Sequence, residues 1–170
     1  MNRIARSGLC VLGLSLAAAC SPSLDWRQVS VDAASTVLMP CKPDRVERRT
    51  NIAGMSADGV MWSCEAGGFN WSTTTLRFRG DAEAAAAQGP VGQALAANLG
   101  SSPPSDAGAA SGRWRVEGRR PDGRPVRAWI RVSRDGAVLF QQVILSPDGG
   151  APSGDAQDTF LAGPERRARP

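Results

Sequence analysis

Four cysteines are the residues of this 170-residue chain whose type and spacing indicate chemistry most directly. Cys10 and Cys20 lie near the N-terminus, and Cys41 and Cys64 lie farther along the chain. A thioredoxin-like redox site needs two cysteines separated by two residues, and a zinc site needs more Cys or His ligands than Cys41 and Cys64 supply. If the chain is exported, as its first 20 residues indicate, Cys10 leaves with the signal peptide and Cys20 carries lipid. Cys41 and Cys64 then remain in an oxidising compartment, and the sequence predicts a disulfide between them.

The first 19 residues have the pattern of a bacterial signal peptide. Arg3 and Arg6 form a positive start, and an apolar run from Leu9 to Leu16 is followed by three alanines, residues 17–19. The apolar run is too short to cross a bilayer, which takes about 20 residues. Residues 1–19 are therefore expected to be removed on export.

Cys20 directly follows this segment. The sequence from Leu16 to Cys20 resembles the bacterial lipobox, in which the cysteine is acylated and becomes the new N-terminus, although Ala17 stands where the motif usually has leucine. The alternative is ordinary cleavage after Ala19, which would leave a free cysteine. Residues 20–24 are interpreted as a lipidated cysteine with a short tether. Ser21 resembles the default signal for sorting to the outer membrane, with the protein facing the periplasm.

The composition excludes many catalytic sites. The chain has no His, which excludes Ser-His-Asp and Cys-His nucleophiles, and its sole lysine, Lys42, does not follow a glycine-rich loop. Paired carboxylates could hydrolyse glycosides, but the Asp and Glu residues are scattered. Removal of residues 1–19 takes away Arg3 and Arg6 and lowers the net charge from +4 to +2, which is too weak to imply a nucleic-acid partner. We expect a protein that is not an enzyme and has no cofactor or metal.

Hydrophobic periodicity predicts one α+β domain over residues 25–163. Strands are expected at 26–31, 36–39, 45–53, 60–64, 69–78, 113–117, 126–133 and 138–145. Gly-rich turns are expected at 54–59 and 67–68, and Asp135-Gly136 predicts a hairpin. A helix is expected at 81–99, where Asp81 could be the N-cap and Pro90 either kinks the helix or starts a second one, and a short helix at 155–161. Residues 164–170 are expected to be a disordered basic tail.

These elements predict an antiparallel sheet of about six to seven strands, flanked by the central helix and the short C-terminal helix. Alternation along two strands places one set of side chains in the core: Trp114, Val116, Val126, Ala128, Ile130 and Val132. The intervening side chains then share the opposite face, with Glu117 among them. Four of these form a candidate interaction patch: Arg115, Arg127, Trp129 and Arg131. The alternative is an ordinary solvated face.

Several short segments resemble a family of lipoproteins from β-proteobacteria. They are Trp26 within Asp-Trp-Arg, the run from Met39 to Pro43, the run from Cys64 to Gly68, and the run from Asp158 to Leu161. The order of elements is similar to the PsbP/Mog1-like α/β sandwich, whose members serve as adaptors or accessory subunits. The resemblance implies no catalytic residues.

Two functions are compatible with these observations. The first is a non-enzymatic protein-binding or accessory role in the cell envelope, with the membrane reached through the N-terminal lipid and an envelope protein as partner. The second is transport or sensing of a small apolar ligand, which requires an apolar pocket of roughly 300 Å³ or more between sheet and helix. The sequence leaves the partner and the oligomeric state open.

Overall fold

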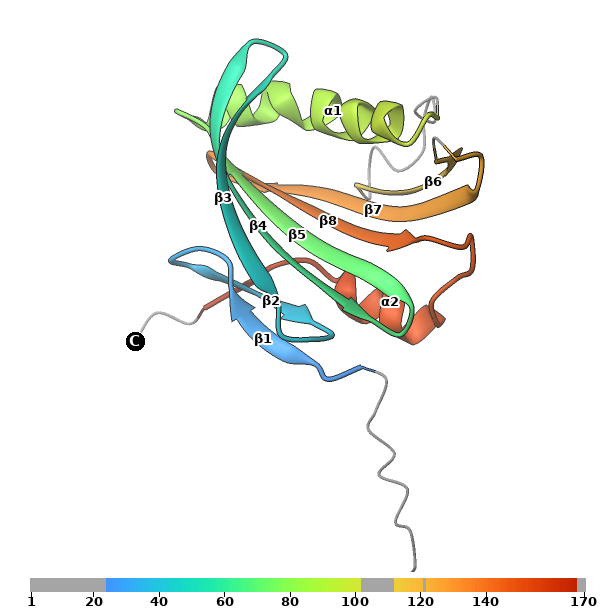
Figure 1. Cartoon of the computed structure of the whole chain (residues 1–170). Coiled ribbons are helices and arrows are strands. Elements are labelled where there is room, and N and C mark those ends of the chain that lie inside the picture. Colours follow the sequence, from blue (N-terminus) through green and yellow to red (C-terminus); the bar gives the residue numbers. More distant parts are fainter. Residues whose placement is uncertain (1–23, 102–111, 121, 168–170) are drawn as a thin grey trace, which may run out of the picture.

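Six antiparallel strands form the main sheet of the computed structural model, which describes residues 24–101, 112–120 and 122–167 (Figure 1). In order across the sheet they are β3 (Asp44–Ile52), β4 (Met55–Ala66), β5 (Phe69–Arg77), β8 (Val138–Ser146), β7 (Pro125–Asp135) and β6 (Arg113–Arg119). The α+β class and the antiparallel sheet predicted from the sequence are confirmed. The predicted signal peptide and Cys20 lie outside the described residues.

A second, three-stranded sheet contains β1 (Arg27–Ser30), β2 (Ser35–Met39) and β9 (Glu165–Arg166), with β2 in the middle. The prediction of a disordered tail from residue 164 is wrong for this part of it. The backbone N–H of Arg167 donates to the carbonyl of Ala34 over 2.8 Å, and Arg166 forms an ion pair with Asp135. Two-residue strands have no periodicity, so the sequence carried no signal for this pairing.

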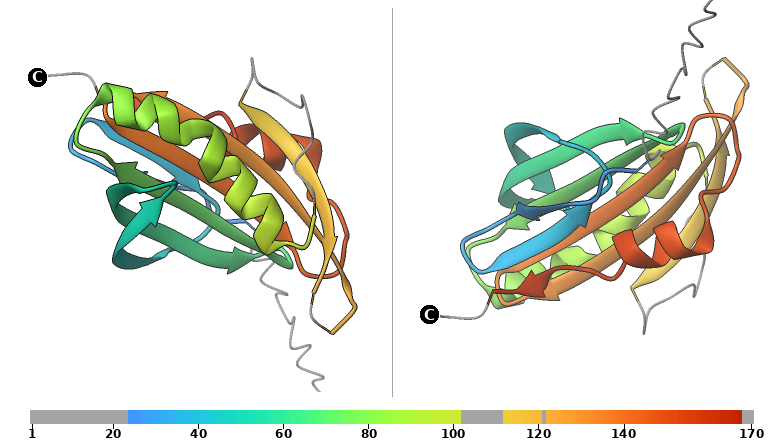
Figure 2. Two further views of the ribbon diagram at one scale, coloured as in Figure 1. Left: turned by 90° about the horizontal axis from the view of Figure 1, so that it is seen from above. Right: turned by 90° about the horizontal axis from the view of Figure 1, so that it is seen from below.

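The two faces of the main sheet are covered by different elements. Helix α1 (Asp81–Asn98) lies over one face, and α2 (Gly154–Phe160) lies with the three-stranded sheet on the other (Figures 1 and 2). Pro90 is inside α1, so one helix forms where the sequence left two possible. Its N-cap is Gly80 rather than Asp81, which stands in the first turn. Neither helix in the described residues is long and apolar enough to cross a membrane.

Alternation along the strands divides the apolar side chains between two cores. The upper core, between α1 and the main sheet, contains Leu76, Phe78, Ala84, Ala87, Val91, Ala96, Val116, Ala128, Ile130, Val132, Leu139 and Val143, among others. The lower core, on the opposite face, contains Val31, Val37, Met39, Trp62, Trp71, Trp129, Val138, Phe140, Ile144, Ala156, Phe160 and Leu161. The sheet is therefore buried on both faces over its central strands.

Tight turns set the register of the long hairpins. Gly67 and Gly68 form the predicted turn, with positive φ angles of 60° and 81°. A two-residue type I′ hairpin turn requires a positive φ at both positions. The turn predicted over 54–59 is wrong in its extent. Ala53 and Gly54 alone make that turn, and β4 begins at Met55. Asp58 lies within β4, where its carboxylate is 2.9 Å from Nε of Arg49.

A disulfide joins Cys41 to Cys64, as predicted, with their Cα atoms 6.0 Å apart. Cys41 lies between β2 and β3, and Cys64 lies near the end of β4, where it packs against the lower core. The bond therefore ties the segment leaving the three-stranded sheet to the main sheet. It closes a loop that includes all of β3.

Replacement of both Cys41 and Cys64 by alanine should lower the free energy of unfolding by about 3 kcal/mol, because the unfolded chain gains the conformations that the closed loop excludes. Urea denaturation of the variant and the wild-type protein measures the difference. A variant as stable as the wild type, or two reactive thiols in oxidised wild-type protein, would contradict this expectation.

Candidate interaction surface

The structure buries the centre of the interaction patch predicted from the sequence. Alternation along β7 is as expected, since Ala128 and Ile130 face α1 and Trp129 faces the other way. The face opposite α1 is nevertheless covered by α2 and the three-stranded sheet, and Trp129 is only 8% exposed. The assignment of Trp129 to an exposed patch is therefore wrong. Trp129 belongs to the lower core.

Arg131 has a structural role in the same layer. Its guanidinium group donates to the carbonyl of Leu161 over 2.6 Å and also to the carbonyl of Ala162. Burial lowers the pKa of Arg131, and the neighbouring positive charge of Arg113 lowers it further. Arg113 lies opposite Arg131 in the ladder and donates to the same Leu161 carbonyl over 2.6 Å. Both cations thus satisfy carbonyls at the C-terminal end of α2, where positive charge is favourable.

Arg115 and Arg127 are the members of the predicted patch that reach solvent. The carboxylate of Glu117 lies 3.6 Å from Nε of Arg115 and 3.0 Å from Nε of Arg127. The Arg127 guanidinium also lies 5.9 Å from the centre of the Trp129 ring. The structure therefore does not bring the four predicted residues together as one exposed patch.

Three pockets lined by described residues are open hollows at the ends and edges of the main sheet. One of about 470 Å³ lies beside β6 at Glu117 and Arg119. A second of about 390 Å³ lies at Arg49 and Arg77, and a third of about 520 Å³ lies beside the β4–β5 turn. None of these three lies between α1 and the sheet, where an apolar ligand was considered. Within the described ranges, no group of three His, Cys, Asp or Glu residues is placed to hold a metal ion.

The most exposed part of the main sheet is its β3 edge. β3 pairs with β4 on one side and with no other described strand on its other side. All six side chains from Asp44 to Arg49 are exposed. We call the free side of Asp44–Arg49, together with the adjacent Met61, the β3 edge surface. An edge strand of this kind presents backbone N–H and C=O groups that another strand can pair with.

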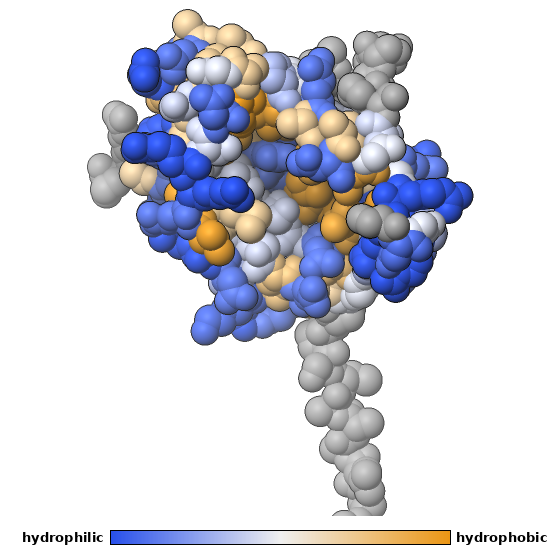
Figure 3. Space-filling view, turned by 45° about the horizontal axis from the view of Figure 1, so that its top comes forward, coloured by the Kyte–Doolittle hydropathy of each residue, from blue (hydrophilic) through white to orange (hydrophobic). Residues whose placement is uncertain are grey.

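An apolar pair interrupts the charged residues of the β3 edge surface. Val46 and Met61 lie opposite each other in the β3–β4 ladder and are 51% and 39% exposed. Among the described residues, the only other large apolar side chain exposed to this degree is Leu38, in the three-stranded sheet. On the side of the molecule shown in Figure 3, apolar residues emerge as small areas among charged ones.

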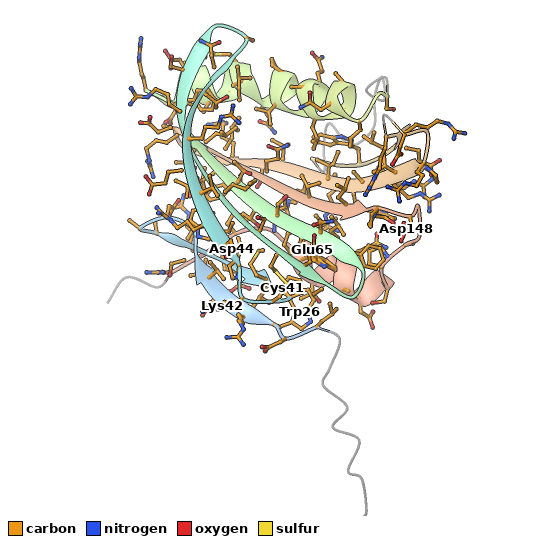
Figure 4. The ribbon with its side chains drawn as sticks, viewed as in Figure 1. Trp26, Cys41, Lys42, Asp44, Glu65 and Asp148 are labelled. Carbon is orange, nitrogen blue, oxygen red and sulfur yellow. A yellow bond between two sulfur atoms is a disulfide. The ribbon has the colours of Figure 1, made fainter. Side chains whose placement is uncertain are left out.

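Charged side chains of both signs flank Val46. Arg45 and Glu47 form an ion pair at 2.5 Å on the face of β3 opposite Val46, and the Arg45 guanidinium lies 5.8 Å from the centre of the Trp62 ring. Asp44 and Arg48 share the face of Val46, and neither has an ion-pair partner within the described chain. Figure 4 shows Asp44 at the start of β3 and Lys42 in the segment that joins Cys41 of the disulfide to β3.

The sequence reasoning missed the β3 edge surface. A signal for Val46 was present, because it is the one large apolar residue between Asp44 and Arg49. Met61 carried no separate signal, since it stands between Val60 and Trp62 in a strand that is mostly apolar. Which strand occupies the edge of a sheet depends on strand order, which periodicity does not determine.

Comparison of the chain with family models, curated proteins and solved structures finds no match. The geometry of the described residues is therefore the basis for the functional interpretation.

Replacement of Trp129 by alanine should lower the free energy of unfolding by about 3–5 kcal/mol, because it leaves a cavity in the lower core. Arg115→Ala is the matched control, since it alters a neighbouring side chain in the same ladder, and it should change stability by less than about 0.5 kcal/mol. Chemical denaturation of both variants measures the difference. Equal stabilities would show that Trp129 does not belong to the core.

Proposed function

We propose that this chain is a lipid-anchored envelope protein that faces the periplasm and binds a protein partner through the β3 edge surface, in a non-enzymatic accessory role. The observation that carries the protein-binding role is the open edge of β3 with Val46 and Met61 exposed side by side. Unpaired backbone groups supply hydrogen bonds to an added strand, and alternate side chains supply selectivity.

The disulfide supports an oxidising compartment such as the periplasm. A six-stranded antiparallel sheet covered by a helix on each face supports the proposed likeness to the PsbP/Mog1-like sandwich and to the β-proteobacterial lipoproteins. In this proposal the fold is a scaffold for an interaction surface.

The position of the N-terminus supports a defined orientation at the membrane. Leu24 packs against the lower core, so the described chain begins on the face of the main sheet opposite α1 (Figure 1). Cys20 precedes Leu24 by only four residues, which span at most about 14 Å when extended. A lipid on Cys20 would hold the three-stranded sheet near the membrane. The β3 edge would then remain open at the side of the molecule.

Replacement of Cys20 by serine should release the protein from the membrane fraction or leave it as an unprocessed precursor, because the residue that carries the lipid is lost. Fractionation of cells that produce the full chain measures the distribution. Mass spectrometry of the N-terminal peptide of the wild-type protein is the independent check. An unmodified N-terminal Cys20 would contradict the anchor.

A photo-crosslinking amino acid placed at Val46 should form covalent adducts with protein in living cells, because a partner strand would lie directly against it. The same amino acid at Gln93, which is exposed on α1, is the matched control. Gel analysis after illumination measures adducts at both positions. If position 46 gives no more adduct than position 93, the β3 edge surface is not the binding surface.

A further inference from the structure

We propose that the β3 edge surface binds a second copy of this chain, so that two copies of β3 pair antiparallel about a two-fold axis through Val46 and join the two main sheets into one. The inference rests on the proposed binding role of the β3 edge surface and adds the identity of its partner.

The ladder geometry allows few alignments. In an antiparallel pair, residues that face each other both direct their N–H and C=O groups toward the partner, or both direct them away. Along β3 this direction alternates with every residue. Two residues that face each other across the pair must therefore be an even number of positions apart in the sequence, and the midpoint between them is a residue. The two-fold axis passes through that central residue, which defines the alignment.

An axis at Val46 brings opposite charges together on both faces. Asp44 then lies opposite Arg48 of the second copy, and Arg45 lies opposite Glu47 of the second copy. The two-fold axis repeats each pair, and opposite charges directly across a ladder stabilise the pairing. Asp44 and Arg48, which have no ion-pair partner within the described chain, gain one each.

Alignments centred on any other residue of Asp44–Arg49 place like charges together, because each of these residues is charged and would face its own copy. An axis at Glu47 puts Glu47 opposite its own copy and Arg45 opposite Arg49 of the second copy. An axis at Arg45 or at Arg48 puts that arginine opposite itself. Like charges directly opposite each other destabilise a ladder, so the charge pattern selects Val46 as the centre.

The apolar residues favour the same centre. A two-fold axis perpendicular to the sheet keeps each face on its own side, so Val46 meets Val46 of the second copy. Because Met61 lies beside Val46 in each copy, a continuous apolar row of four side chains then crosses the joined sheets. The pairing covers the side chain of Val46, which is 51% exposed in the single chain.

This arrangement is compatible with anchoring in one membrane. The same axis places α1 of both copies on one face of the joined sheet and Leu24 of both copies on the other face. Pairing over five residues buries less than the roughly 1,200–2,000 Å² typical of a stable interface. We therefore expect the dimer to form mainly at the membrane, where anchoring raises the effective concentration.

A cysteine in place of Val46 tests the alignment directly. Facing Cα atoms in an antiparallel pair are about 4.5–5.5 Å apart, within the range that a disulfide bridges. Val46→Cys in the full, membrane-bound chain should give a disulfide-linked dimer on mild oxidation. Thr50→Cys is the matched control on the same strand, because its two copies would lie about 27 Å apart, eight residues at about 3.4 Å each.

Charge reversal tests the selectivity in the Val46→Cys background. Arg45→Glu places a glutamate opposite Glu47 of the second copy and should lower the yield of linked dimer at least about fivefold. The double change Arg45→Glu with Glu47→Arg restores opposite charges and should restore the yield. Thermal unfolding of each variant controls for folding. Recovery of the dimer yield in the double variant would show that Arg45→Glu alone had not simply disrupted the structure of β3.

Equal linking at positions 46 and 50, or no recovery in the double variant, would overturn the dimer. Photo-crosslinks from position 46 that contain only a different protein would overturn it while supporting the proposed function. Absence of any adduct at position 46 would overturn both. Linked dimer at position 46 alone, lost and restored with the charges, supports the dimer.

Discussion

Burial of the main sheet on both faces is the constraint on which the rest of the structure depends. Side chains alternate along β7 and β8, so each of these strands supplies both cores, and each polar side chain that points inward needs a partner. The amide nitrogen of Gln142 donates to the carbonyl of Phe160 over 2.5 Å, and Arg131 donates to that of Leu161. These bonds attach the C-terminal end of α2 to the sheet. They also allow polar residues to occupy a buried face.

The same constraint explains why two parts distant in the sequence form one layer. The main sheet leaves its lower face to be covered by β1 and β2 from the start of the domain and by α2 from its end. β9 joins them by pairing with β2, and Phe160 packs its ring 5.2 Å from that of Trp71. The disulfide links this layer to β4 at its other side. The central strands are covered on both faces, and β3 remains at one edge.

Charged residues on an edge strand commonly prevent unwanted pairing, and the β3 edge surface has enough of them to do so. Simple protection, however, requires no particular order of charges. Here the signs read as opposites in either direction from Val46, with Asp44 and Arg45 before it and Glu47 and Arg48 after it. The same residues can therefore reject unrelated strands and accept a second copy in one alignment, which is how attraction and repulsion together produce selectivity.

The sequence by itself determined the α+β class, the Cys41–Cys64 pairing, the approximate positions of most strands and both helices, and which side chains of β7 share one face. These features depend on local periodicity, turn residues and the number of cysteines available. Tertiary structure alone decided the burial of Trp129, the role of Arg131, the pairing of β9 with β2 and the exposure of Val46. Alternation shows that two residues lie on opposite faces, but only the positions of the other elements decide what covers each face. For Trp129 the cover is α2 and the three-stranded sheet. β3 lies at an edge because no other strand of the described residues pairs with its free side.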